Sequence, residues 1–194
     1  MNSVEDWLEE YAKYDEIYNG VERDKVKITL NNIEQRVSKA IAKARYKNAR
    51  DKNVTDKKIG DQSNWETDLE GIGSEIAAAK AFNVYPDLEV GHIPTADLVI
   101  DGYTIDIKST KYATGHLLAT KTKLDRQCDV YVLVVGTFPN YELKGWCSKS
   151  DLFKPENLKD LGMGEGYALP QDKLKDINRL IKYKKVQAGG EQPI

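Results

Sequence analysis

The chain has 194 residues, of which 40% are hydrophobic and 31% are charged, and its formal net charge is −2. This length suits one ordinary domain with a sizeable core, and the composition excludes disordered and fibrous proteins. The longest apolar run, from Val130 to Val135, is six residues long, whereas a membrane-spanning helix needs roughly 20. Cys128 and Cys147 are too few for a zinc ribbon or a disulfide framework.

The first residues, Met1-Asn2-Ser3-Val4-Glu5-Asp6, lack the basic and apolar regions of a signal peptide, so we expect a cytoplasmic protein. Charge is distributed unevenly along the chain. Residues 1–24 carry eight acidic and two basic side chains, and residues 25–60 carry three acidic and eleven basic ones. We therefore expect an N-terminal helical extension over residues 1–60, acidic and then basic, without strands. A core over residues 61–188 and a disordered tail over residues 189–194 would follow.

Two helices are predicted within the extension. In the acidic part, aromatic residues at helical spacing form one stripe that packs on the domain or on a second copy of the chain, which makes a homodimer possible. They are Trp7, Tyr11, Tyr14 and Tyr18. The second helix, over residues 26–50, has an apolar arc and an adjacent row of cations. The apolar arc comprises Leu30, Ile33, Val37, Ala40, Ile41 and Ala44. The cations, called the basic row below, are Arg36, Lys39, Lys43, Lys47 and Arg50.

The basic row favours binding to a polyanion such as DNA, because solvated helix faces usually alternate charges of opposite sign and this row contains no acid. A merely solvated helix face is the alternative. Two further lysines, Lys121 and Lys123, are candidate phosphate contacts near the site described next.

Beyond residue 60 the pattern predicts a mixed α/β fold. A helix over residues 66–82 follows a segment rich in turn residues, and residues 121–127 are consistent with a second, short helix. Short β segments follow from residue 86 onward. They cover residues 88–93, 96–100, 103–109, 129–135 and 141–148.

Asp101-Gly102 is a strong signal for a two-residue hairpin turn. The register of such a hairpin places Asp97 opposite Asp106, and strand alternation puts Lys108 on the same face as Asp106. Two facing carboxylates need a proton or a cation, and oxygen ligands favour a hard divalent metal such as Mg²⁺. Glu75, on the buried side of the 66–82 helix, offers a third carboxylate.

A helix with Glu75, a strand with Asp97 and a strand with Asp106-Ile107-Lys108 resemble the PD-(D/E)xK nuclease superfamily over residues 66–148. One departure is that Ala96, not proline, precedes Asp97. More loosely, residues 68–77 and 143–146 are similar to segments of small phage-encoded members, for which the location would be the host cytoplasm. The resemblance implies a restriction-endonuclease-like mixed β-sheet flanked by helices, with the N-terminal helical region added to it.

The resemblance also implies a metal-dependent nuclease that acts on DNA, endonucleolytically, and leaves a 5′-phosphate and a 3′-hydroxyl. It implies that Glu75, Asp97, Asp106 and the Ile107 carbonyl bind Mg²⁺, for which Mn²⁺ can substitute, and that Lys108 activates the attacking water. The alternatives are a non-catalytic DNA-binding or assembly protein, an exonuclease and an RNase.

The acid-x-Lys pattern also occurs at Asp56-Lys57-Lys58 and Glu142-Leu143-Lys144. The first lies in a charged segment without strand character. In the second case, a turn at residues 137–140 would pair Asp129 with a residue near Ser148, so Asp129 and Glu142 are not expected to converge. A solvated hairpin face is the remaining alternative for the Asp97, Asp106 and Lys108 set.

Overall fold

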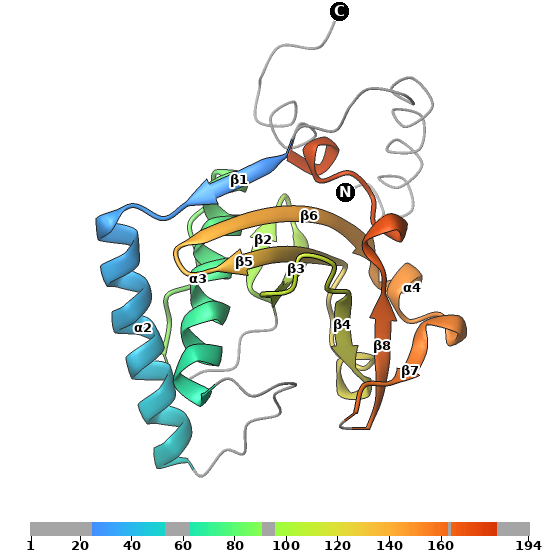
Figure 1. Cartoon of the computed structure of the whole chain (residues 1–194), viewed down its shortest axis with the longest axis horizontal. Helices are drawn as coiled ribbons and strands as arrows, with labels where there is room; N and C mark the ends of the chain where they lie inside the picture. The colour runs from blue at the N-terminus through green and yellow to red at the C-terminus, as the bar shows by residue number, and fades with distance from the viewer. Residues whose placement is uncertain (1–24, 53–62, 91–95, 163, 182–194) are drawn as a thin grey trace, which may run out of the picture.

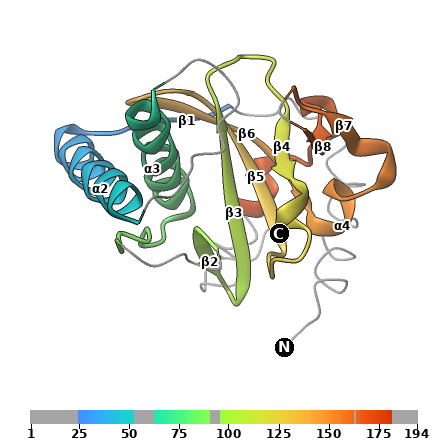
Figure 2. The ribbon, with the colours of Figure 1, turned by 90° about the horizontal axis from the view of Figure 1, so that it is seen from below.

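Three layers make up the computed structural model, which describes residues 25–52, 63–90, 96–162 and 164–181. Helices α2 (Asn32–Asp51) and α3 (Asn64–Phe82) lie together on one face of a curled five-stranded sheet, and a three-stranded sheet covers its other face (Figures 1 and 2). The expected mixed α/β class is confirmed. Each face of the large sheet has its own cluster of buried side chains, so the large sheet lies between two cores.

The large sheet has the strand order β1-β6-β5-β3-β2. Its strands are β1 (Val26–Thr29), β2 (Leu98–Ile100), β3 (Tyr103–Thr110), β5 (Val130–Thr137) and β6 (Asn140–Ser148). Strands β3 and β5 pair in parallel, and the other neighbours are antiparallel. A parallel pair needs a long crossover. Here the crossover contains β4 (Leu117–Thr120) and the 3₁₀ turn η1 (Lys121–Lys123).

The three-stranded sheet has the order β4-β8-β7, with β7 at Leu158–Asp160 and β8 at Glu165–Leu169. Two short elements, α4 (Lys149–Leu152) and η2 (Pro155–Asn157), connect β6 to β7. A further 3₁₀ turn, η3 (Gln171–Lys173), follows β8. The three strands of this sheet were not predicted.

Strand β5 explains the longest apolar run in the sequence. Val130, Val132 and Val134 belong to the core on the helix side, whereas Tyr131 and Leu133 belong to the core on the small-sheet side. A strand buried on both faces is apolar throughout instead of alternating. The predicted strands over residues 103–109, 129–135 and 141–148 are confirmed by β3, β5 and β6, with small shifts at their ends.

The expectation that the first 60 residues contain no strand is wrong at β1, which pairs with β6 at the edge of the large sheet. Strand β1 contains Val26, Ile28 and Thr29, whose β-branched side chains favour strands. Helix α2 begins only at Asn32. Asn31 accepts hydrogen bonds from the Glu34 amide and Glu34 bonds back to the Asn31 amide, which forms a capping box.

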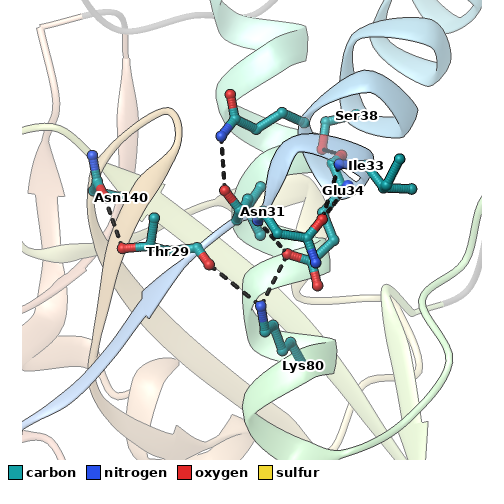
Figure 3. Close-up of polar contacts among 9 residues, drawn as sticks. Thr29, Asn31, Ile33, Glu34, Ser38, Lys80 and Asn140 are labelled. Carbon is teal, nitrogen blue, oxygen red and sulfur yellow. Dashed lines mark hydrogen bonds and ion pairs between the residues drawn. The ribbon is translucent and has the colours of Figure 1, made fainter.

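The start of α2 is also tied to α3 (Figure 3). Lys80 on α3 donates hydrogen bonds to the carboxylate of Glu34 and to the carbonyl of Thr29, at 3.0 and 3.3 Å. The described part of the segment predicted as an N-terminal extension, residues 25–52, is therefore built into the same core as α3 and β6.

The predicted buried face of α2 is right only in part: Leu30 is buried, and Val37 and Ile41 pack against the core on the helix side. Ile33 is 64% exposed and Ala40 is exposed, whereas Ser38 and Ala42 are fully buried. Glu34 and Arg45 contact α3 and lie on the same side of the helix as Ser38. Small side chains on this face allow α2 to approach α3 closely, which periodicity of large apolar residues does not reveal.

The other predicted elements are confirmed, shortened, wrong or outside the described residues. Helix α3 confirms the predicted 66–82 helix and begins two residues earlier, where Ser63 and Glu66 form a capping box. Residues 84–90 form no strand, so the first half of the predicted 88–93 strand is wrong. The predicted helix over residues 121–127 is reduced to η1. The aromatic stripe of residues 7–18 and the tail of residues 189–194 lie outside the described residues.

A close contact between α3 and the β5–β6 hairpin gives the first testable prediction. A Cβ on Gly73 would overlap the Tyr141 hydroxyl, which is held in place by Glu70. Gly73→Ala should therefore lower the free energy of unfolding by about 1–3 kcal/mol. Gly71→Ala is the matched control, because no atom lies within 4 Å of its Cβ position, and it should be neutral or stabilising by up to about 1 kcal/mol. Equal effects in urea unfolding would contradict this account.

Candidate functional site

The β2–β3 hairpin forms as predicted. Asp101 and Gly102 have positive φ angles of 51° and 88°, as a type I′ turn requires, and the pairs Ile100–Tyr103, Val99–Thr104 and Leu98–Ile105 follow. The ladder ends one residue before the predicted Asp97–Asp106 pair. Here the Asp97 amide donates to the Ile105 carbonyl, and the Asp97 carboxylate accepts a hydrogen bond of 2.6 Å from the Ile107 amide.

Asp106 lies on the face of β3 that turns toward the small sheet, whereas Ile105 and Ile107 belong to the core on the helix side, as predicted. Asp106 is only 2% exposed. Its Oδ1 accepts a hydrogen bond of 2.7 Å from Nζ of Lys123, and its Oδ2 contacts Nζ of Lys108. A buried carboxylate needs such partners, because an unpaired buried charge is very costly.

Glu75 on α3 is mostly buried and pairs with Arg45 on α2, with 2.9 Å between Oε2 and Nη1. Arg45 also donates to the carbonyl of Asp87, at 3.2 Å. A carboxylate on the buried side of a helix needs a partner, and Arg45 was not predicted to be that partner. A signal was present: Arg45 lies well away from the basic row around the helix axis, on the face that contains Ser38.

Electrostatic interactions join these groups into one cluster, called the acid–lysine cluster below. Burial and the nearby Asp97 carboxylate raise the pKa of Glu75 to about 7, against the opposing effects of Arg45 and Lys108. Burial and the nearby Lys123 ammonium lower the pKa of Lys108 to about 8, against the opposing effects of Asp97 and Glu75. The acid–lysine cluster comprises Glu75, Asp97, Asp106, Lys108 and Lys123. Of these, Asp106 is in contact with Lys108 and Lys123. Glu75 and Asp97 interact with Lys108 through space, and their hydrogen-bond partners are Arg45 and the Ile107 amide.

The raised pKa of Glu75 predicts a pH-dependent loss of stability. Because the folded state binds this proton more tightly than the unfolded state, stability should fall as pH rises from 4.5 to about 7. Glu75→Gln keeps a hydrogen-bond acceptor for Arg45 but does not titrate. In EDTA, the unfolding free energy of this variant should therefore fall by on the order of 3 kcal/mol less than that of the wild type as the pH rises. Urea unfolding at pH 5 and pH 8 measures the effect. Glu142→Gln is the control, and an unchanged loss in Glu75→Gln would contradict the burial of Glu75.

The donor chemistry of the acid–lysine cluster fits a hard divalent cation. It offers three carboxylates and the main-chain carbonyl of Ile107, all oxygen donors of the kind that Mg²⁺ prefers. Oδ2 of Asp106 is buried, and its partner among the described residues is the ammonium group of Lys108. Among those residues, however, no three metal-binding side chains are close enough to hold an ion together. Each carboxylate is bound instead to a partner of its own.

The competing acid-x-Lys pattern at Glu142 is separated from the cluster, as predicted. Glu142 pairs with Val135 in the ladder and forms an ion pair with Lys144 at 2.6 Å, whereas Val130 pairs with Ser148. Asp129 instead accepts hydrogen bonds from the amide and hydroxyl of Thr104. Asp56 lies outside the described residues.

The predicted DNA contacts lie in two places. Four members of the basic row are exposed and Arg50 is partly so. Lys39 lies 5.6 Å from the centre of the Phe138 ring. In η1, Lys121 pairs with Glu165 at the surface, and Lys123 joins the acid–lysine cluster.

No family model matches the chain, and neither does any curated protein or any solved structure. In the part of the chain that the structure describes, no helix is long and apolar enough to cross a membrane.

Proposed function

We propose that the protein is a metal-dependent nuclease of the PD-(D/E)xK type, with a restriction-endonuclease-like core. The observation that carries the proposal is the acid–lysine cluster. Glu75, Asp97 and the Asp106-Ile107-Lys108 segment come from a helix, the start of a hairpin and its second strand. The charges of Glu75, Asp97 and Lys108 act on one another, and Lys108 contacts Asp106. Clusters of groups with perturbed pKa values occur preferentially at functional sites.

In this proposal Glu75, Asp97, Asp106 and the carbonyl of Ile107 hold Mg²⁺, and Mn²⁺ can replace it. The bound metal lowers the pKa of a coordinated water and neutralises charge on the phosphoryl group. Lys108 lies beside Asp106, where its ammonium group can orient the attacking water and stabilise charge that develops on the phosphate. Arg45 acts as a positioning residue, because it fixes the carboxylate of Glu75.

DNA is the proposed substrate, with endonucleolytic cleavage to a 5′-phosphate and a 3′-hydroxyl, and the cytoplasm is the proposed location. The basic row would supply contacts to the DNA backbone that do not depend on sequence. Cleavage of both strands would need two sites, for which a homodimer is proposed. Sedimentation velocity with and without DNA measures the oligomeric state.

The basic row gives a prediction for binding. Lys39→Gln/Lys43→Gln/Lys47→Gln should weaken the binding of duplex DNA and reduce the slope of log K against log salt by about 2–3, because each lysine that contacts a phosphate contributes roughly 0.9. Anisotropy titrations at several salt concentrations measure the slope. Lys159→Gln/Lys173→Gln, at exposed lysines elsewhere, is the control. An unchanged slope in the triple variant would exclude the basic row as the DNA contact.

Cleavage of matched oligonucleotides tests the proposed reaction. Duplex DNA, single-stranded DNA and RNA of one sequence, labelled at the 5′ end, are incubated with Mg²⁺ or with EDTA. The proposal predicts metal-dependent cleavage of DNA, with products that carry a 5′-phosphate. Cleavage of RNA alone would identify an RNase that uses the same site. Products shortened only from an end would identify an exonuclease.

The ion pairs in the acid–lysine cluster favour the alternative of a non-catalytic DNA-binding or assembly protein, because charges neutralised by Arg45, Lys108 and Lys123 can serve stability alone. Thermal unfolding distinguishes the two. A ligand that binds only the folded state raises its stability. A working metal site should therefore raise the melting temperature in millimolar Mg²⁺, and a non-catalytic protein should not respond.

A further inference from the structure

The two lysines of η1 that were predicted as phosphate contacts have different partners: Lys123 pairs with the buried Asp106, and Lys121 pairs with the exposed Glu165. Lys121, two residues earlier in the same 3₁₀ turn, has a side chain that is 51% exposed and pairs with Glu165 at the surface. Lys123 has a side chain that is 23% exposed, and its Nζ lies 2.7 Å from Oδ1 of Asp106. Two lysines of one turn therefore have different environments, and only Lys123 reaches a buried carboxylate.

Two ammonium groups contact the carboxylate of Asp106. Lys108, on the same strand, contacts Oδ2, and Lys123, from the crossover between β3 and β5, occupies Oδ1. Both oxygens that Asp106 offers are therefore covered by ammonium groups. An ammonium group and a divalent cation compete for the same carboxylate oxygen, because both bind to its lone pairs.

We propose that Lys123 is a displaceable counter-ion of Asp106. It neutralises this carboxylate in the metal-free protein, and it leaves Oδ1 when a divalent cation binds. This inference rests on the proposed function, because it takes Asp106 as a metal ligand.

Lys108 extends from an interior strand of the large sheet, whereas Lys123 extends from a three-residue turn that follows an edge strand of the small sheet. Lys123 is therefore the lysine that can withdraw. Its released ammonium group is then free to bind a phosphate oxygen of DNA.

Calorimetric titration of the full chain with Mn²⁺, without DNA, tests the competition. Lys123→Met removes the competitor and should tighten Mn²⁺ binding by about fivefold or more, within the range typical of coupled sites. Lys121→Met, the matched control from the same turn, should bind Mn²⁺ like the wild type. Lys123→Gln should change binding in the same direction and decides the question if Lys123→Met does not fold.

Chemical labelling separates displacement from a general effect of charge. Acetylation of lysines by acetic anhydride, read by mass spectrometry, should increase at Lys123 of the wild type when Mn²⁺ is added and should stay constant at Lys121. A simple through-space repulsion between Lys123 and the metal would tighten binding in Lys123→Met without this change in labelling, and the displacement model would then be wrong.

The outcomes also separate this inference from the proposed function. If the wild type binds Mn²⁺ and Lys123→Met binds it equally or more weakly, only the counter-ion inference fails. If neither the wild type nor the lysine variants bind Mn²⁺ or Mg²⁺, the proposed metal centre fails, and the inference fails with it.

Discussion

Asp106→Asn should lower the rate of Mg²⁺-dependent DNA cleavage by at least about a thousandfold, since a catalytic metal contributes several kcal/mol to transition-state stabilisation. Asn has almost the shape of Asp but lacks the charge that holds a metal. Asp106 is the most buried carboxylate of the acid–lysine cluster, and both of its oxygens contact lysines. Single-turnover cleavage of a labelled duplex measures the rate.

Asp101→Asn is the matched control for Asp106→Asn. Asp101 lies in the turn of the same hairpin with a φ angle of 51°, which Asn also adopts readily, and its side chain is exposed. This variant should cleave like the wild type. Circular dichroism shows whether each variant is folded. A folded Asp106→Asn variant that retains more than about a tenth of the wild-type rate would remove Asp106 from the proposed reaction.

Lys108→Met should lower the cleavage rate by about 10²- to 10⁴-fold, which is the usual contribution of a positioned proton-transfer group. It should leave the binding of Mn²⁺ in place, because Lys108 is not among the proposed ligands. Met keeps most of the length and apolar character of the side chain, which lies 6.0 Å from the centre of the Tyr131 ring. Cleavage rates and Mn²⁺ titrations of the same protein samples separate the two effects.

The sequence supplies its own control for Lys108→Met. Lys144 is the lysine of the second acid-x-Lys pattern, which the structure separates from the cluster, and it pairs with Glu142. Lys144→Met should therefore leave cleavage unchanged. If Lys144→Met abolished cleavage and Lys108→Met did not, the wrong one of the two patterns would have been assigned to the site.

Local signals predicted the parts of the fold that depend on few, nearby residues. The Asp101-Gly102 turn set the register of the β2–β3 hairpin, and the strand predicted over residues 129–135 is found as β5. Strands β1, β4, β7 and β8 gave no comparable signal. They are three to five residues long, and β1 and β4 find their partners far along the chain. Pairing across such distances depends on tertiary packing, which local patterns do not encode.

The buried face of α2 was predicted only in part, because large apolar residues were taken to mark the core; Val37 and Ile41 do pack against it. Ile33 lies in solvent, and the small residues Ser38 and Ala42 are buried. The same error hid the partner of Glu75, since Arg45 lies on the face that packs against α3. A cation on the buried face of a helix is a signal for an acid on the facing helix.

The acidic residues of the candidate site could be proposed from sequence because strand alternation and helix periodicity are local rules. Asp106 and Lys108 are in contact on β3, and Glu75 is buried on α3, where it pairs with Arg45 and interacts with Lys108 through space. Lys123 was predicted as a phosphate contact near the site, and its ion pair with Asp106 was not predicted. Its place depends on how the crossover between β3 and β5 folds back, and β4 and β8 hold that crossover through a pairing that the sequence did not predict.

The most direct test of the metal-dependent nuclease is the cleavage of supercoiled plasmid by the wild-type protein in Mg²⁺ and in EDTA. The account predicts nicked and linear products in Mg²⁺, intact plasmid in EDTA, and intact plasmid with Asp106→Asn in either condition. Cleavage that persists in EDTA, or that Asp106→Asn performs as fast as the wild type, would contradict it.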